Sequence, residues 1–308
     1  MKKISNLFIM LIMMLSLTAC SVSSSKNENT AVTASKVTDE KENETVEEKK
    51  VLFDDNNIFV EYRGIEEYSS DSWIINLYVE NNTDSDFYLS TRNVLINNCT
   101  VGLSNSVVEI KKGTKYLAEP NFNFVLNLEN LEPYNIKSVD SINFELYMSH
   151  EILGEAFSSS EVNLSPKKAF ESSSRVLGSS EDKTIILNDN DILIEYRGLE
   201  KYSSDSWIVN LYIENETDSD FYVSANDVQI NGFALELSNS QSLIQSGSKY
   251  MSFPNFDFII DSNKLKSYGI ESIDELSFNI SLSHEILGES FIEKSVNLNP
   301  GISVVVED

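Results

Sequence analysis

The chain contains two copies of one sequence, displaced from each other by 134 residues. Residues 61–64 (EYRG) recur at 195–198, and residues 69–73 (SSDSW) recur at 203–207. The same displacement relates DSDFY at 84–88 to 218–222 and SHEILG at 149–154 to 283–288, without insertion or deletion. Such a long period indicates a tandem duplication of one domain and not a solenoid of short repeats. Whatever fold this sequence adopts, the chain forms it twice.

Apolar and polar residues alternate along both copies. Trp73, Ile75, Leu77 and Val79 share one face of residues 73–79, and residues 207–213 repeat this pattern. A period of two is typical of antiparallel strands with one buried face. Further strands are expected at 58–63, 87–96, 100–104, 115–118, 142–149 and 156–164, and short helices near 127–134 and 261–268.

About seven strands in a unit of about 115 residues predict an all-β fold, an immunoglobulin-like β-sandwich in each copy. An open barrel is the alternative. The proposed organisation has two sandwich domains that follow a signal peptide and a disordered tether. Its segments are a signal peptide at 1–19, a tether at 20–50, repeat 1 at 51–165, a flexible linker at 166–184, repeat 2 at 185–300 and a tail at 301–308.

The beginning of the chain has the pattern of a bacterial lipoprotein signal. Lys2 and Lys3 precede an apolar stretch at 7–17, and Leu17-Thr18-Ala19-Cys20 looks like a lipobox. The apolar stretch is shorter than the roughly 20 residues that span a bilayer. We therefore expect a removable export signal and a fatty-acylated Cys20 that holds the protein on the outer face of the cell membrane.

The charge of the chain limits its partners. The formal net charge is -26. Nucleic acid is disfavoured as a partner, because binding to phosphates needs clustered Lys and Arg. Anionic headgroups should repel the chain as well, so membrane attachment is expected through lipid on Cys20. The acidic excess serves either general solubility or recognition of a basic ligand.

With these features the chain resembles lipoproteins of Gram-positive bacteria that carry tandem immunoglobulin-like domains. The resemblance rests on Leu17-Thr18-Ala19-Cys20 and on the two β-rich units. It implies lipidation of Cys20 and no other functional residue. The paired cysteines of antibody domains are absent, so Trp73 and Trp207 are expected to pack without a disulfide. Cys99 aligns with Phe233 of the second copy and is expected to be a small buried residue.

No pattern in the sequence predicts catalysis, a cofactor or a metal. His150-Glu151 and His284-Glu285 begin like a His-Glu-x-x-His zinc motif, but Gly154 and Gly288 occupy the fifth position. A hairpin turn is the preferred interpretation. The acidic runs at 54–57 and 188–191 lack the spacing of a calcium loop. Each is expected to be a loop before the first strand of its repeat, with weak calcium binding as the alternative. The sequons at Asn81 and Asn215 fit exposed turns.

Aromatic residues give the best candidates for a binding surface. The candidates are Tyr68, Phe122, Phe124, Tyr202, Phe256 and Phe258. Aromatic rings on loops supply contact area at low entropic cost. Alternatively, Phe122 and Phe124 face the core. The sequence favours a non-enzymatic, lipid-anchored binding or adhesion module at the cell envelope, with an unknown protein or carbohydrate ligand. The alternative is an accessory subunit of a membrane transport or signalling complex.

Overall fold

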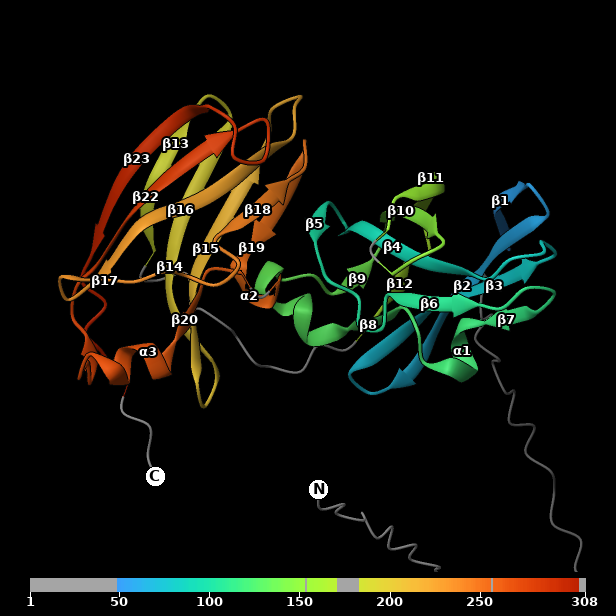
Figure 1. Ribbon diagram of the computed structural model, residues 1–308, viewed down its shortest axis with the longest axis horizontal. Coiled ribbons are helices and arrows are strands. Elements are labelled where there is room, and N and C mark those ends of the chain that lie inside the picture. Colours follow the sequence, from blue (N-terminus) through green and yellow to red (C-terminus); the bar gives the residue numbers. More distant parts are fainter. Residues whose placement is uncertain (1–48, 153, 171–182, 256, 305–308) are drawn as a thin grey trace, which may run out of the picture. The chain divides into compact units, whose positions relative to one another are not determined.

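The computed structural model describes residues 49–152, 154–170, 183–255 and 257–304 (Figure 1). The signal peptide, Cys20, nearly all of the tether and most of the linker lie outside the described residues.

Repeat 1 consists almost entirely of short strands. In chain order its elements are β1 (Lys50–Asp55), β2 (Ile58–Ser69), β3 (Ser72–Asn81), β4 (Phe87–Ile96), β5 (Cys99–Thr100), β6 (Val107–Ile110), β7 (Lys115–Leu117), α1 (Ala118–Asn121), β8 (Val125–Asn127), the 3-10 turns η1 (Leu128–Asn130) and η2 (Glu132–Tyr134), β9 (Ser138–Val139), β10 (Ile142–Ser149), β11 (Ala156–Leu164) and β12 (Lys168–Ala169).

Repeat 2 follows the same order. Its elements are β13 (Thr184–Asp189), β14 (Ile192–Ser203), β15 (Ser206–Asn215), β16 (Phe221–Ile230), β17 (Phe233–Ala234), β18 (Gln241–Ile244), β19 (Ser248–Met251), α2 (Ser252–Asn255), β20 (Ile259–Asp261), α3 (Ser262–Ser267), β21 (Ser272–Ile273), β22 (Leu276–Ser283), β23 (Ser290–Leu298) and β24 (Ile302–Ser303).

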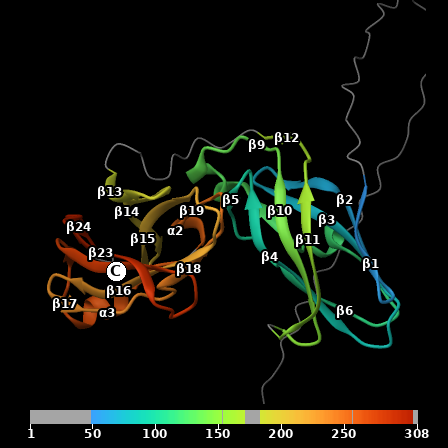
Figure 2. The same ribbon diagram turned by 90° about the horizontal axis from the view of Figure 1, so that it is seen from above.

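Each repeat folds its strands into two antiparallel layers. One layer of repeat 1 has the order β1-β2-β3-β7 with β8 beside β3, and the other has the order β11-β10-β4-β5 with β6 beside β4 (Figure 2). Repeat 2 reproduces both, as β13-β14-β15-β19 with β20 beside β15 and as β23-β22-β16-β17 with β18 beside β16. The equal offset between matching strands follows from the gapless duplication.

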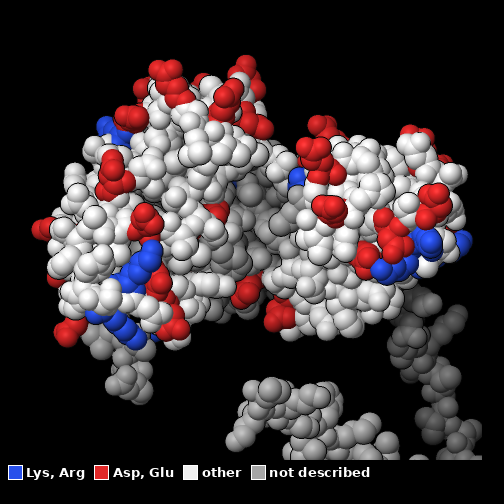
Figure 3. All heavy atoms as spheres, viewed as in Figure 1, with Lys and Arg blue, Asp and Glu red and all other residues white. Residues whose placement is uncertain are grey.

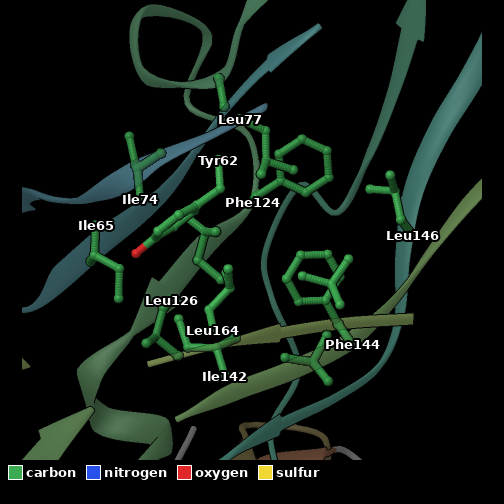
Figure 4. Close-up of a cluster of buried hydrophobic side chains, with 14 of the residues drawn as sticks. Tyr62, Ile65, Ile74, Leu77, Phe124, Leu126, Ile142, Phe144, Leu146 and Leu164 are labelled. Carbon is green, nitrogen blue, oxygen red and sulfur yellow. The ribbon is translucent and has the colours of Figure 1, made fainter. Parts of the chain in front are cut away.

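The apolar faces of the two layers enclose the core of each repeat. In repeat 1, Leu77 and Tyr62 from one layer meet Phe144 and Leu146 from the other (Figure 4). Repeat 2 has its own cluster, in which Leu211 and Tyr196 take the places of Leu77 and Tyr62. Burying each large apolar side chain contributes about 1.5–3 kcal/mol to folding. The structure thus confirms the all-β sandwich fold.

Several local predictions are wrong. Of the strand expected at 100–104, only Thr100 lies in a strand, and Ser104 makes an isolated bridge to Val125. The helix expected at 127–134 is replaced by η1 and η2, because Pro133 in the first turn of η2 has no amide hydrogen and interrupts helical bonding. In repeat 2 the segment without this proline forms α3, which Asp261 caps by accepting a hydrogen bond from the Asn263 amide at 2.8 Å.

The acidic runs are not loops before the first strand. Asp55 ends β1, and Asn56 and Asn57 turn the chain into β2 with positive φ angles of 52° and 62°. Asn tolerates this left-handed conformation, which two-residue hairpin turns require. Asn190 and Asp191 form the same turn, with φ angles of 51° and 61°. The runs therefore belong to a hairpin in each repeat.

Ordered structure extends past the expected edges of both repeats. In the segment assigned to the linker, β12 pairs with β9, and the Phe170 ring lies edge-on to Trp73 at 5.4 Å between centroids. In the segment assigned to the tail, β24 pairs with β21, and Val304 is buried.

The register of the strands gathers the turns at two opposite ends of each sandwich. Ile58 pairs with Asn81, Phe87 pairs with Ile110, and Ser149 pairs with Tyr88, so the β1–β2, β3–β4, β6–β7 and β10–β11 turns meet at one end. We call it the histidine end. The β2–β3 turn lies at the other, which we call the aromatic end. In Figure 1 the histidine end of repeat 2 is uppermost, and α3 lies at its aromatic end.

Candidate functional site

The aromatic end of repeat 1 carries two of the predicted surface residues in contact. Tyr68 lies near the end of β2, and Phe122 follows α1. Their ring centroids are 4.7 Å apart, and the residues are 52% and 45% exposed. Phe122 has a φ angle of 55° and ends α1 by donating its amide hydrogen to the Glu119 carbonyl. This left-handed cap directs the ring toward Tyr68 instead of into the core.

Two other predicted surface residues are core residues. Phe124 and Phe258 have no exposed surface, and Figure 4 shows Phe124 among the buried side chains of repeat 1. Phe122 and Phe124 lie two positions apart and would share one face of a regular strand, but both have positive φ angles. Phe122 is therefore exposed and Phe124 is buried, so neither the surface prediction nor the core alternative holds for both residues. In repeat 2, Tyr202 is exposed, and Phe256 lies outside the described residues.

The histidine end carries a stacked pair of rings in each repeat. His150 stacks on Phe157 with 4.6 Å between centroids, and His284 stacks on Phe291 with 4.5 Å. Each histidine is also held from the neighbouring loop, since Nδ1 lies 3.3 Å from the Asp86 carbonyl oxygen in repeat 1 and 3.1 Å from that of Asp220 in repeat 2. The preferred interpretation of the histidine motif as a hairpin turn is confirmed, because it lies between β10 and β11 and between β22 and β23.

The turn beside these rings exposes large aliphatic side chains. Ile152 and Ile286 are each 62% exposed, and Leu287 is 92% exposed. We call residues 150–152 with 154–155, and residues 284–289, the apolar tips of repeats 1 and 2; Leu153 lies outside the described residues. A Cβ atom on Gly288 would lie 3.1 Å from the Glu285 carbonyl oxygen, a tight contact, so the close turn favours glycine there. The fold sets no comparable requirement for aliphatic residues at Ile286 and Leu287, which face solvent.

A buried asparagine shapes the neighbouring β3–β4 loop. The Asn81 side-chain amide donates to the carbonyls of Ser85 at 2.9 Å and Ile110 at 3.1 Å. Its Oδ1 accepts from the Thr83 amide at 3.0 Å and from the Thr83 hydroxyl at 2.6 Å. Asn81 has no exposed surface, and neither does Asn215, which repeats all four bonds. The expectation of exposed turns is therefore wrong for Asn81 and Asn215, which end β3 and β15 and anchor the loops, whereas the next residues of the sequons, Asn82 and Glu216, are exposed.

A hollow of about 330 Å³ opens beside the tip of repeat 2. His284 and Phe291 form one part of its wall, and Asp218 and Thr217 of the β15–β16 loop form another. The remaining lining residues are Asn190, Ile192, Ser219, Phe221 and Ile292. The hollow combines apolar walls with carboxylate at the rim, an arrangement that suits a ligand with both apolar and cationic parts.

The histidine ends of the two repeats differ in their basic side chains. In repeat 1, Lys111 Nζ lies 3.1 Å from Asp86 Oδ2 and 2.7 Å from Glu109 Oε1. The pKa of Asp86 is lowered by the hydrogen bond from the Lys112 amide and by Lys111. Repeat 2 has Gln245 and Ser246 at these positions. Asp220 keeps the bond from the backbone amide, given by Ser246 at 2.8 Å, but has no lysine in the aligned position.

The sequence prediction omitted Phe157 and Phe291. The signal that could have found them is the run SHEILGE, which is identical at 149–155 and 283–289 and is followed two residues later by phenylalanine in both copies. This run includes exposed positions, where sequence is normally free to drift.

Cys99 is buried, and burial raises the pKa of its thiol to about 11. Among the described residues, no three His, Cys, Asp or Glu side chains are placed to hold a metal ion together. The same part of the chain has no helix of the length and apolarity that a membrane crossing needs. No family model matches the chain, and no curated protein matches it.

Proposed function

We propose that the chain is an extracytoplasmic lipoprotein, anchored through acylated Cys20, whose two immunoglobulin-like domains form a non-enzymatic binding module at the cell envelope. The observation that carries the binding role is that the aligned residues Ile152 and Ile286 are equally exposed at the same end of both repeats, within an identical stretch of sequence. The anchor and its location are supported by the lipobox-like sequence before Cys20.

The exposed tips argue for recognition because folding does not account for them. Leu287 is almost completely exposed, so it contributes little to the core of repeat 2. The adjoining strand has diverged, with Ser158-Ser159-Ser160 in β11 aligned with Ile292-Glu293-Lys294 in β23. Retention of the tip beside such divergence favours a contact that both copies make with a partner. Interaction sites are marked by exposed apolar residues that adjoin one another, as Ile286 and Leu287 do in the turn of repeat 2.

Two tips on one chain also allow bivalent binding. Once one repeat is bound, the second repeat meets the same partner surface at a high effective concentration, which raises the overall affinity when the geometry permits both contacts. A lipid anchor would add to this effect by holding both repeats close to other envelope components.

The binding role is tested by affinity capture from envelope extract with the purified full chain. We compare the unmodified chain with the triple variant Ile152→Ser, Ile286→Ser and Leu287→Ser. A matched control carries Tyr68→Ser and Tyr202→Ser, which remove exposed aromatic rings at the opposite ends. The proposal predicts that the tip variant loses a partner that the control retains. Equal capture of all partners by the tip variant and the unmodified chain would refute it.

The anchor is tested separately in the native cells. Cys20→Ala removes the acylation site, so we expect the protein either to leave the membrane fraction or to remain unprocessed. Two acyl chains give stable anchoring, whereas a single chain binds only marginally. A processed Cys20→Ala variant that stays in the membrane fraction would contradict the anchor.

A further inference from the structure

We infer that the histidine end of repeat 2 docks a basic, partly apolar segment of a partner protein, and that repeat 1 binds the same segment more weakly. The inference rests on the proposed binding function and specifies the chemistry of the partner. It combines the exposed tip, the hollow beside it and the difference in charge between the two repeats.

Apolar side chains lie both in the wall of the hollow and on the tip beside it. His284 and Phe291 stack in its wall, and the Phe221 ring meets Phe291 edge-on at 6.2 Å between centroids. Phe291 keeps 43% of its surface exposed, and Ile286 and Leu287 extend the apolar surface along the tip. An aliphatic side chain, or the methylene stem of a lysine, would cover these groups and remove them from water.

The charge around this surface selects a cation. The four turns at the histidine end of repeat 2, residues 189–191, 216–220, 245–247 and 284–289, contain seven acidic residues and no Lys or Arg. Figure 3 shows acidic side chains gathered along this end of repeat 2, uppermost in the view. Such a surface attracts basic groups and repels acidic ones.

The same charge argues against the other occupants of an apolar surface. A second copy of the chain carries a net charge of -26 and would be repelled. An anionic bilayer surface would also be repelled by the acidic rim. A basic protein segment satisfies both the apolar and the acidic parts of the surface.

Repeat 1 offers a natural comparison. Its corresponding turns, residues 55–57, 82–86, 111–113 and 150–155, contain five acidic residues and the two lysines Lys111 and Lys112. Lys111 already pairs with Asp86 and Glu109. In Figure 3, basic side chains lie among the acidic ones at this end of repeat 1. The tip is the same in sequence, so the weaker binding of a cation is expected from two differences: the two lysines, and Asn57 and Asn82 in place of Asp191 and Glu216.

The test uses the purified full chain and a fluorescein-labelled peptide in which Lys alternates with Leu, with binding followed by fluorescence anisotropy. Two further peptides have Glu in place of Lys or Ser in place of Leu. We expect the Lys-Leu peptide to bind most tightly. Removing the aliphatic groups with Ile286→Ser and Leu287→Ser should weaken binding by about tenfold or more, given the usual contribution of buried aliphatic side chains.

The charge is tested by exchange between repeats. Gln245→Lys with Ser246→Lys gives repeat 2 the cations of repeat 1 and should weaken binding by about three- to tenfold, as expected for two exposed charges. Asn263→Lys with Ser267→Lys is the matched control, because it adds equal charge on α3 at the opposite end and should leave affinity nearly unchanged. The reverse exchange, Lys111→Gln with Lys112→Ser, should strengthen binding by repeat 1.

The inference is overturned if the charge exchange and the α3 control weaken binding equally, or if the Glu-Leu peptide binds as well as the Lys-Leu peptide. Capture of the unmodified chain by phosphatidylglycerol or phosphatidylcholine vesicles, lost with the tip substitutions, would assign the surface to lipid and also overturn it. Failure of this inference can be distinguished from failure of the proposed function. If an envelope partner depends on the tips but is not displaced by the Lys-Leu peptide, the binding function stands and only the basic chemistry of the partner is refuted. Circular dichroism spectra and melting curves equal to those of the unmodified chain establish that each variant folds.

Discussion

Replacing Asn215 with alanine should destabilise repeat 2 strongly, although the residue lies next to a turn and the change creates only a small cavity. The Asn215 side chain makes four hydrogen bonds, two to carbonyls and two from Thr217, and has no exposed surface. Each bond contributes about 0.5–1.5 kcal/mol net, and a buried polar partner left without a hydrogen bond costs about 1–3 kcal/mol. The carbonyl of the buried Ile244 is such a partner.

These contributions lead us to expect a loss of about 3 kcal/mol in the free energy of unfolding of repeat 2. This corresponds to a decrease of about 100-fold in its folding equilibrium constant and a fall of about 12 °C or more in its melting temperature. Asn215→Asp should be at least as harmful, because it keeps the acceptor but removes the two donors and buries a charge.

The assay follows unfolding of repeat 2 by the fluorescence of Trp207 during thermal and urea denaturation. The chain has two tryptophans, one in each repeat, so a Trp73→Phe background isolates the signal of repeat 2. Glu216→Ala is the matched control, since this adjacent side chain is exposed and should change stability by less than about 0.5 kcal/mol. A midpoint for Asn215→Ala equal to that of Glu216→Ala would refute the role of Asn215 as an anchor.

Two further predictions concern pH. Burial raises the pKa of Asp257, although hydrogen bonds from Ser242 and Tyr250 oppose this shift. The contribution of Asp257 to stability is therefore present below its unfolded pKa and is lost as the pH rises through its folded pKa. Asp257→Asn, which copies Asn123 of repeat 1, should flatten the pH dependence of the Trp207-monitored midpoint between acid and neutral pH, and an unchanged slope would contradict this. The hydrogen bond from Tyr78, together with the one from Lys115, lowers the pKa of Glu80 to about 2. The stabilising effect of the ionised Glu80 is therefore lost as the pH falls toward that value. Tyr78→Phe should raise the Glu80 pKa toward 4.5 in a carboxyl NMR titration, and an unchanged Glu80 pKa would show that the Tyr78 hydroxyl is not responsible.

The strands with alternating sequence were predictable because one face of each is buried. Burial of Leu77 and Phe144 on facing layers requires a period of two, and this requirement is visible without any structure. The short elements follow different causes. β5 spans two residues, and α1 ends at a left-handed Phe122, so a hydrophobic period does not reveal either of them.

The candidate site was predictable only in part for a similar reason. Tyr68 and Phe122 are separated by more than fifty residues, and their contact depends on the cap of α1. Alternation placed Phe122 and Phe124 on the same face, but their positive φ angles place one ring at the surface and the other in the core. His150 was singled out by its sequence motif, whereas its stacking partner Phe157 depends on the register of β10 and β11.

The duplication provides an internal control, because each repeat carries a tip of identical sequence on the same fold. The pairs of residues that fix the loops, such as Asn81 and Asn215, make the same bonds in both copies. A difference in binding between the repeats can therefore be traced to the few turn residues whose charge has changed, namely Lys111 and Lys112 against Gln245 and Ser246, and Asn57 and Asn82 against Asp191 and Glu216. If the lysines determine the preference, exchanging them should transfer it from one repeat to the other while both tips stay unaltered.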